Sequence, residues 1–140
     1  MNRKFLQHIP FIKRLYPSII KKIFYIFNIK NLNCKFFNVN FILNINEPIE
    51  KEILLFNHYE NEQINFLIKN LKNKKFDYFI DVGANSGLYS LIIANLFRSI
   101  KVKSFEPISY SIKKLKKNLS INKNIDNVEI FEFGLSIEDS

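Results

Sequence analysis

The chain has 140 residues, enough for one domain with one hydrophobic core. Hydrophobic residues make up 47% of it, with only three glycines and four prolines, which excludes disordered and fibrous proteins. The single cysteine, Cys34, excludes an internal disulfide framework and a cysteine-based metal site, and it fits a reducing cytoplasm. We therefore expect a cytoplasmic protein that holds no metal ion.

The formal net charge of +8 is unevenly spread along the chain. Residues 1–46 carry eight basic residues and no acidic one, whereas residues 47–140 carry 13 basic and 13 acidic residues. The basic character therefore belongs to an N-terminal segment. This asymmetry predicts a basic segment over residues 1–45, which we expect to be helical and β-hairpin-like, and a separate domain over residues 46–140.

Residues 1–30 combine basic and bulky apolar side chains. Ser18 is a candidate helix cap, and the apolar residues after it repeat at helical spacing: Ile20, Ile23, Phe24 and Phe27. Lys21 and Lys22 interrupt the apolar run, so we expect no membrane span, which needs ~20 apolar residues. Two interpretations stay open: a helix packed on the domain with its lysines in water, or a helix lying on an anionic membrane.

The next elements alternate between strand and helix patterns. Residues 35–43 have the period of a half-buried strand, with Phe37, Val39, Phe41 and Leu43 on one face. Residues 44–48 form a predicted turn, and residues 49–56 are either irregular or a short helix. Residues 60–73 have a helical period in Ile64, Leu67, Ile68 and Leu71.

The C-terminal half predicts three strands separated by two helices. The expected strands are residues 76–82, 102–106 and 128–133, and the expected helices begin near Leu88 and after Pro107, the second capped by Ser109 or Ser111. Leu88, Leu91, Ile92 and Leu96 form the predicted buried stripe of the first helix. Such an order gives an α/β fold with a parallel sheet, flanking helices and right-handed crossovers.

Four lysines lie on one face of the last predicted helix: Lys113, Lys114, Lys116 and Lys117. They indicate either a nucleic-acid patch or the solvated side of an amphipathic helix. No aromatic residue alternates with them, which favours the solvated side.

The segment from Asp81 to Gly87 is a candidate ligand-binding turn. Gly83 and Gly87 bracket it, Asn85 tolerates a left-handed backbone, and Ser86 is placed to cap the following helix. Missing side chains let a ligand approach the backbone, and the N–H groups at such a turn are expected to point at it.

A parallel sheet brings the carboxyl ends of its strands to one edge, so Asp81, Glu106 and Leu135 should converge. Glu106 lies 25 residues after Asp81, and its carboxylate suits the two hydroxyls of a ribose. Ile108 could cover one face of an adenine. Neither the G-x-G-x-x-G pattern nor the phosphate-binding loop is present, which disfavours a pyrophosphate. A nucleoside ligand without pyrophosphate remains, and S-adenosylmethionine fits.

The turn and its surroundings resemble the FkbM family of class I S-adenosylmethionine-dependent methyltransferases. Residues 81–90, D-V-G-A-N-S-G-L-Y-S, resemble its D-V-G-A-N-x-G motif, and Phe105-Glu106-Pro107 resembles its F-E-P. Residues 117–122 resemble its K-N-x-x-x-N stretch, and residues 134–136 resemble its A-L-S, with Gly134 in place of the usual alanine. A Tyr59-Glu60 pair also resembles one in that family. The resemblance covers about residues 46–140.

This resemblance implies a Rossmann-like fold and a set of cofactor contacts. The turn, with Asp81, Gly83, Ala84, Asn85 and Gly87, would hold the methionine part of S-adenosylmethionine, and Glu106 would hold the ribose. Ile108 and Leu135 would border the adenine. It also implies a sheet of about seven strands, of which we expect the first three here, with the methyl acceptor and any catalytic base beyond the third strand.

Three functions stay open at this stage. The first is a FkbM-like methyltransferase acting on a hydroxyl of a sugar or small molecule, with this chain carrying the cofactor-binding half. The second is an RNA methyltransferase of the same fold, which the basic N-terminal segment would support. The third is a truncated, non-catalytic fragment or a membrane-peripheral binding module that acts through residues 1–30.

Overall fold

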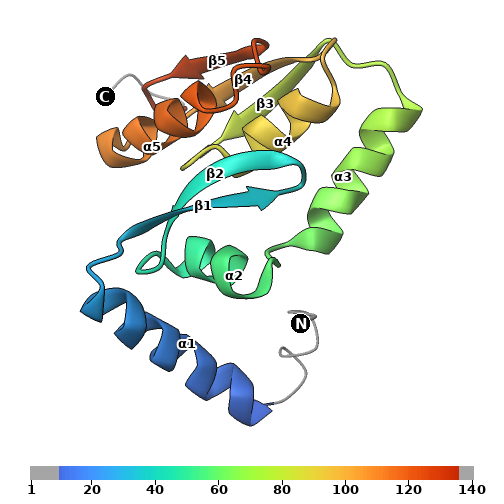
Figure 1. Cartoon of the computed structure of the whole chain (residues 1–140). Coiled ribbons are helices and arrows are strands. Elements are labelled where there is room, and N and C mark those ends of the chain that lie inside the picture. The colour runs from blue at the N-terminus through green and yellow to red at the C-terminus, as the bar shows by residue number, and fades with distance from the viewer. Residues whose placement is uncertain (1–9, 136–140) are drawn as a thin grey trace. The chain divides into compact units, whose positions relative to one another are not determined.

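A computed structural model describes residues 10–135, which form two compact units. The first comprises residues 10–36 and 41–61, and the second comprises residues 37–40 and 62–135. The predicted α/β class is confirmed, because helices flank a three-stranded parallel sheet in the second unit (Figure 1).

The first unit is built on α1 (Pro10–Ile26), β1 (Asn31–Phe36), β2 (Val39–Asn44) and α2 (Pro48–Phe56). Its core cluster contains Ile45, Leu55 and Phe56, and the partly buried Ile20, Phe24 and Leu54 pack against it. Residues 49–56, which the sequence leaves as irregular or a short helix, belong to α2. Pro48 lies in the first turn of this helix, where a missing N–H removes no intrahelical hydrogen bond.

Two expectations about α1 are wrong. The helix begins at Pro10, so Ser18 lies inside it, as does Pro17, which lacks the N–H that would bond to the preceding turn. Of the predicted apolar face, Ile20 and Phe24 contact the core, whereas Ile23 and Phe27 are exposed. Among residues 10–135, no helix combines the length and the apolar character that crossing a bilayer would require.

Residues 31–44 form a hairpin, as expected for the N-terminal segment, but the strand expected over residues 35–43 is interrupted by its turn. Phe37 and Asn38 both have positive φ, at 45° and 64°, as a two-residue type I′ turn requires. The alternation holds for β2, since Val39, Phe41 and Leu43 are buried. The strand pattern did not show the reversal because Phe37 is an unusual residue at positive φ.

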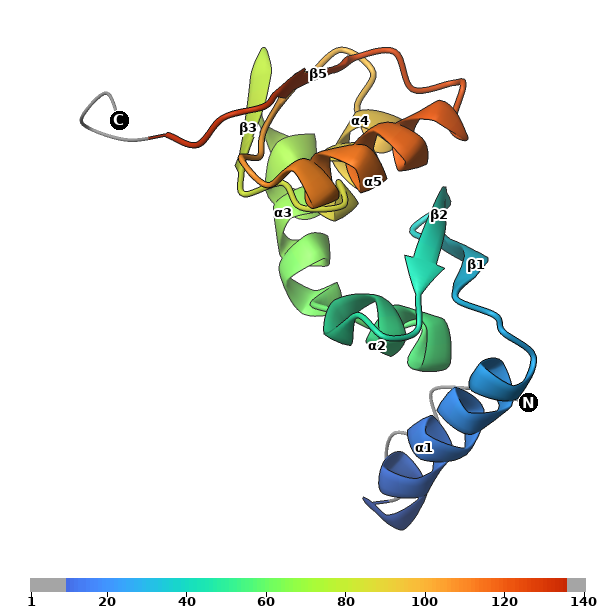
Figure 2. The same ribbon diagram turned by 90° about the vertical axis from the view of Figure 1, so that its left-hand side faces the viewer.

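The second unit continues with α3 (Asn61–Asn73), β3 (Tyr78–Val82), α4 (Leu88–Leu96), β4 (Lys101–Phe105), α5 (Ser109–Ser120) and β5 (Val128–Phe131). The strands are parallel in the order β3-β4-β5, with Asp81 beside Ser104 and Phe105 beside Phe131. Figure 2 shows α4 and α5 on the same side of this sheet, as two right-handed crossovers in one direction require.

The two faces of the sheet differ in how deeply their side chains are buried. On the helix-covered face, Val102 and Ser104 are fully buried, as are Leu91, Ile92 and Ile93 of α4. The alternate positions face the other way, where Tyr78, Ile80 and Val82 are more than half exposed. Phe105 and Phe131 stack on that second face with ring centroids 4.6 Å apart. Only one face of this sheet is therefore covered by helices that connect its strands.

Asn122, just after α5, fastens the hairpin turn to the second unit. Its amide nitrogen donates to the carbonyl oxygens of Asn40 and Asn118, each at 2.7 Å, and its oxygen accepts from the Asn40 N–H at 3.0 Å. Asn122 is only 4% exposed, so solvent cannot replace these bonds easily.

We predict that Asn122→Ala lowers the free energy of unfolding by about 1–3 kcal/mol, because polar backbone groups lose their partner. Asn124→Ala is the matched control, since Asn124 is exposed and its side chain bonds only Asn95, so its effect should stay within about 0.5 kcal/mol. Urea unfolding measures both, and equal losses would contradict the role of Asn122.

Candidate functional site

The turn between β3 and α4 is bound to the end of β4 by backbone hydrogen bonds. The N–H groups of Gly83 and Ala84 both donate to the carbonyl oxygen of Phe105, at 2.9 and 3.0 Å. The Gly87 N–H donates to the Ala84 carbonyl oxygen at 2.8 Å, which closes the turn. The conformation of the turn therefore depends on the strand pairing beneath it.

Glu106 completes this arrangement with its side chain. One carboxylate oxygen accepts the Asn85 N–H at 2.8 Å, and the other accepts the Ile108 N–H at 2.9 Å. The residue is only 4% exposed, although its carboxylate lies at the carboxyl edge of the sheet. Since each carboxylate oxygen has a second lone pair, Glu106 can still accept from a ligand hydroxyl.

The expectation that the amides of the turn point at a ligand is wrong for Gly83, Ala84 and Asn85. All three N–H groups donate within the protein, to Phe105 or to Glu106. The turn is consequently a preformed rim whose polar contacts to a ligand would come from carboxylate and carbonyl oxygens.

The two glycines of the turn serve different purposes. Both have positive φ, 79° at Gly83 and 86° at Gly87, and Asn85 between them has φ of 48°. A Cβ atom at Gly83 would meet nothing within 4 Å, whereas one at Gly87 would lie 2.1 Å from the Cδ1 atom of Leu115. Gly87 therefore lets α5 pack closely, and Gly83 leaves open space above the turn.

Asp81 lies in a hydrogen-bonded chain of hydroxyl groups below the turn. One carboxylate oxygen accepts from the Ser90 hydroxyl at 2.5 Å and from the Ser90 N–H at 3.1 Å. The Ser90 hydroxyl is 2.7 Å from that of Ser104. Burial raises the pKa of Asp81 above its ordinary value of 3.8, the bonds from Ser90 lower it, and the charge of Glu106 raises it.

The serine caps expected for the two helices are absent. Gly87 is the N-terminal cap residue of α4 and Ile108 that of α5, neither with a side-chain cap bond. Ser86 instead is buried, and its carbonyl oxygen accepts from the amide nitrogen of Asn118 at 2.9 Å. Asn118 thus supports the turn from α5, a role that the sequence pattern alone does not distinguish from a surface asparagine.

The remaining predicted site residues lie on the loops after β4 and β5. Ile108 and Leu135 are 60% and 56% exposed, so both side chains are accessible. The loop after β5 lies beside the loop after β4, because a Cβ atom on Gly134 would be 3.7 Å from the Cγ atom of Pro107. In residues 10–135, no group of three or more His, Cys, Asp or Glu side chains is arranged to hold a metal ion.

Taken together, a buried carboxylate, a half-buried carboxylate, a rigid glycine turn and two exposed apolar side chains occupy one edge of the sheet. Such a set can bind hydroxyl groups, a cationic group and a flat apolar ring. It offers no cluster of free backbone N–H groups at Gly83–Asn85 for a phosphate.

Sequence comparison finds relatives that match about half of the chain or less. A stretch of 69 residues is 35% identical to the methyltransferase sdnD of Sordaria araneosa, covering 49% of this chain and 26% of that protein. Another of 57 residues is 42% identical to the AMB antimetabolite synthetase AmbE of Pseudomonas aeruginosa, covering 41% of this chain and 3% of that protein. No protein-family model matches the chain.

Several solved structures with a similar fold are methyltransferases. The P. horikoshii TYW2 protein in complex with MeSAdo has a TM-score of 0.54 at 19% identity, over 75% of this chain and 36% of that one. A SAM-dependent methyltransferase from Agrobacterium tumefaciens has a TM-score of 0.56 at 11% identity, over 74% and 32%. The fold of the chain is therefore that of S-adenosylmethionine-dependent methyltransferases, and the chain spans about a third of these structures.

We predict a graded response to alanine at the three glycines. Gly87→Ala should destabilise most, by more than about 1–2 kcal/mol, since it adds a clash with Leu115 to the strain of a left-handed residue. Gly83→Ala should cost only the strain, about 1–2 kcal/mol. Gly134→Ala is the control and should be neutral or stabilising by about 0.4–1 kcal/mol. Urea unfolding ranks them, and a different order would contradict the packing role of Gly87.

The raised pKa of Asp81 predicts a pH dependence of stability. An acid whose pKa is higher in the folded state stabilises the fold below pH 3.8, and that stabilisation is lost as the pH rises through the raised pKa. The unfolding free energy of wild type should therefore fall relative to Asp81→Asn as the pH increases above about 4. Ser90→Ala, which removes a bond to the ionised form, should move this change to higher pH. A pH-independent difference between wild type and Asp81→Asn would refute the assignment.

Proposed function

We propose that the chain binds S-adenosylmethionine and carries the cofactor-binding half of a FkbM-like methyltransferase. The observation that supports this most directly is Glu106, whose buried carboxylate holds the glycine turn at Asn85 and the following loop at Ile108. A carboxylate held at this edge repels phosphate and accepts hydroxyl groups, which suits a nucleoside without pyrophosphate.

Three parts of the cofactor have a matching group on the protein: the ribose, the adenine and the amino group of the methionine end. Glu106 retains free lone pairs for the 2′- and 3′-hydroxyls of the ribose. The exposed side chains of Ile108 and Leu135 flank the adenine. Asp81, with carbonyl oxygens of the turn from Gly83 to Gly87, binds the methionine end, where an ammonium group would favour the ionised carboxylate.

The proposed reaction is transfer of a methyl group to a hydroxyl of a sugar or small molecule. S-adenosylmethionine would supply the methyl group of a sulfonium: the acceptor oxygen would attack the methyl carbon in line, the C–S bond would break, S-adenosylhomocysteine would leave, and the hydroxyl proton would pass to a base or to water. The residues of the site contribute binding and orientation. Hydrogen bonds within the protein hold the rim formed by Gly83, Ala84 and Asn85 in place before a ligand arrives. The motif resemblance to the FkbM family supports the hydroxyl as acceptor, and the methyltransferase relative supports methyl transfer in general.

We predict that Glu106→Gln weakens S-adenosylmethionine binding by about 10- to 100-fold, which corresponds to losing hydrogen bonds to a charged group of about 1.5–3 kcal/mol. Isothermal titration calorimetry measures the affinity. Glu132→Gln is the matched control, because it removes the same charge at an exposed position that pairs with Lys116, and it should bind as wild type does.

In Glu106→Gln, the new amide nitrogen faces the backbone N–H of Asn85 or of Ile108 and cannot accept a hydrogen bond from it. Thermal unfolding must therefore show that this variant is folded. A second variant avoids this difficulty. Ile108→Ser changes a side chain that is 60% exposed, so it should weaken binding without lowering the unfolding temperature. If Glu106→Gln and Ile108→Ser both bind like wild type, or if ATP binds more tightly than S-adenosylhomocysteine, the cofactor assignment is wrong.

A further inference from the structure

The first unit carries a second surface with a chemistry of its own, on the outer side of α1. Leu15, Ile19, Ile23 and Ile26 follow one another at spacings of four, four and three residues, so they form one stripe along the helix. Their side chains are between 40% and 74% exposed. The core contacts of α1 lie on a different side, through Ile20 and Phe24.

α1 carries charge of one sign only, and by helical spacing Lys22 lies next to the stripe while Lys21 lies nearer to Phe24. Lys21 and Lys22 are exposed on the same helix, and Tyr25 and Phe27 add aromatic rings that are 88% and 70% exposed. Residues 1–46 contain eight basic residues and no acidic one. An apolar stripe bordered by lysines and aromatic residues is typical of helices that lie in the interface of a membrane.

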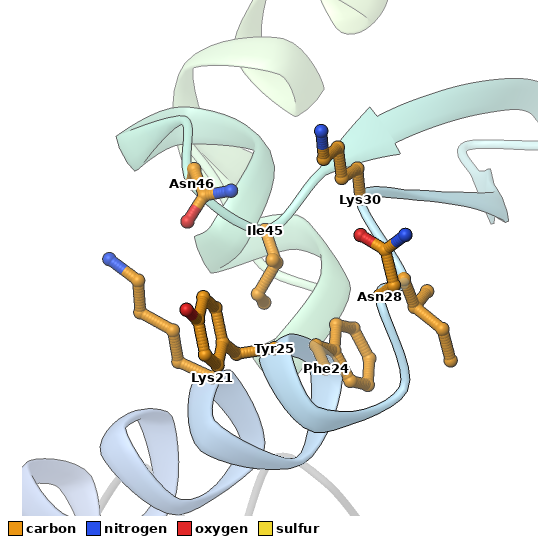
Figure 3. Close-up of a pocket in the computed structure, with 8 residues that line it drawn as sticks. Lys21, Phe24, Tyr25, Asn28, Lys30, Ile45 and Asn46 are labelled. Atoms are coloured by element: carbon orange, nitrogen blue, oxygen red, sulfur yellow. The ribbon is translucent and has the colours of Figure 1, made fainter.

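A cavity of about 630 Å³ lies on the Phe24 side of the same helix, away from the stripe, and acidic residues are absent from its lining. It is lined by Lys21, Phe24, Tyr25, Asn28, Ile29, Lys30, Ile45 and Asn46. Figure 3 shows Lys21 and Lys30 on opposite sides, with Phe24 and Ile45 between them. Two ammonium groups beside an apolar floor suit a phosphate group attached to an acyl chain.

We propose that α1 docks this protein on an anionic phospholipid surface. The stripe of Leu15, Ile19, Ile23 and Ile26 enters the boundary between headgroups and acyl chains, and Lys21, Lys22 and Lys30 contact the lipid phosphates. The proposal does not depend on the cofactor site. It would bring the methyltransferase fold to acceptors that are presented at a membrane.

Co-sedimentation with vesicles tests the proposal on the full chain. Wild type should bind vesicles of phosphatidylglycerol and phosphatidylcholine, bind pure phosphatidylcholine weakly, and lose affinity as salt is raised. Ile19→Gln/Ile23→Gln should weaken binding by at least about ten-fold, because apolar area is no longer buried in the membrane. Ile80→Thr/Val82→Thr, which alters equally exposed apolar residues of the sheet, should bind as wild type does.

A charge-matched pair of variants tests the electrostatic part. Lys21→Gln/Lys22→Gln should lose about five-fold in affinity for each lysine, whereas Lys113→Gln/Lys117→Gln, with the same change in net charge, should not. Circular dichroism confirms that each variant remains folded. Equal binding by the two lysine variants, or equal binding of both vesicle types, would overturn the proposal. The proposal would also be overturned if wild type formed a dimer and bound no vesicles, and if Ile19→Gln/Ile23→Gln dissociated that dimer.

Discussion

The candidate site depends on how the end of β4 holds the turn after β3. The carbonyl oxygen of Phe105 accepts hydrogen bonds from two N–H groups of that turn, and the carboxylate of Glu106 accepts one from a third. These hydrogen bonds continue the pairing of β3 with β4 and also set the geometry of the site. Phe105 can reach the turn because its register places it beside Val82. The shape of the turn is therefore present before any ligand binds, and a ligand need not spend binding energy on ordering it.

Support for this arrangement comes from α5 as well. Asn118 bonds to the carbonyl oxygen of Ser86, and Leu115 fills the space that Gly87 leaves free. The asparagines that resemble a family motif are thus explained by structure rather than by ligand contact, since Asn122 bonds to Asn40. The motif residues divide into those that could meet a cofactor and those that hold the turn in place.

The second face of the sheet is largely exposed in the described residues. Parallel sheets are normally buried on both faces. Here Tyr78, Ile80 and Val82 are more than half exposed, while Phe105 and Phe131 stack beside them. The chain spans 26% of the methyltransferase relative and about a third of the similar solved structures. On the same face, Lys101 and Lys103 lie over the Tyr78 ring, and the ammonium group of Lys103 is 5.0 Å from the ring centroid. These lysines partly shield the ring from water.

Much of the second unit could be predicted from the sequence, because apolar periodicity and glycine position are local signals. The strands ending at Val82 and Phe105, the helix from Leu88 and the position of Asp81 and Glu106 at the carboxyl edge of the sheet follow from residue types and spacing. Tertiary contacts decided the rest. Serine caps are absent because Ser86 is buried beneath α5, the strand expected over residues 35–43 reverses at Phe37, and the amides of the turn are taken by Phe105 and Glu106. Those bonds join residues that are distant in the chain, and no local pattern encodes them.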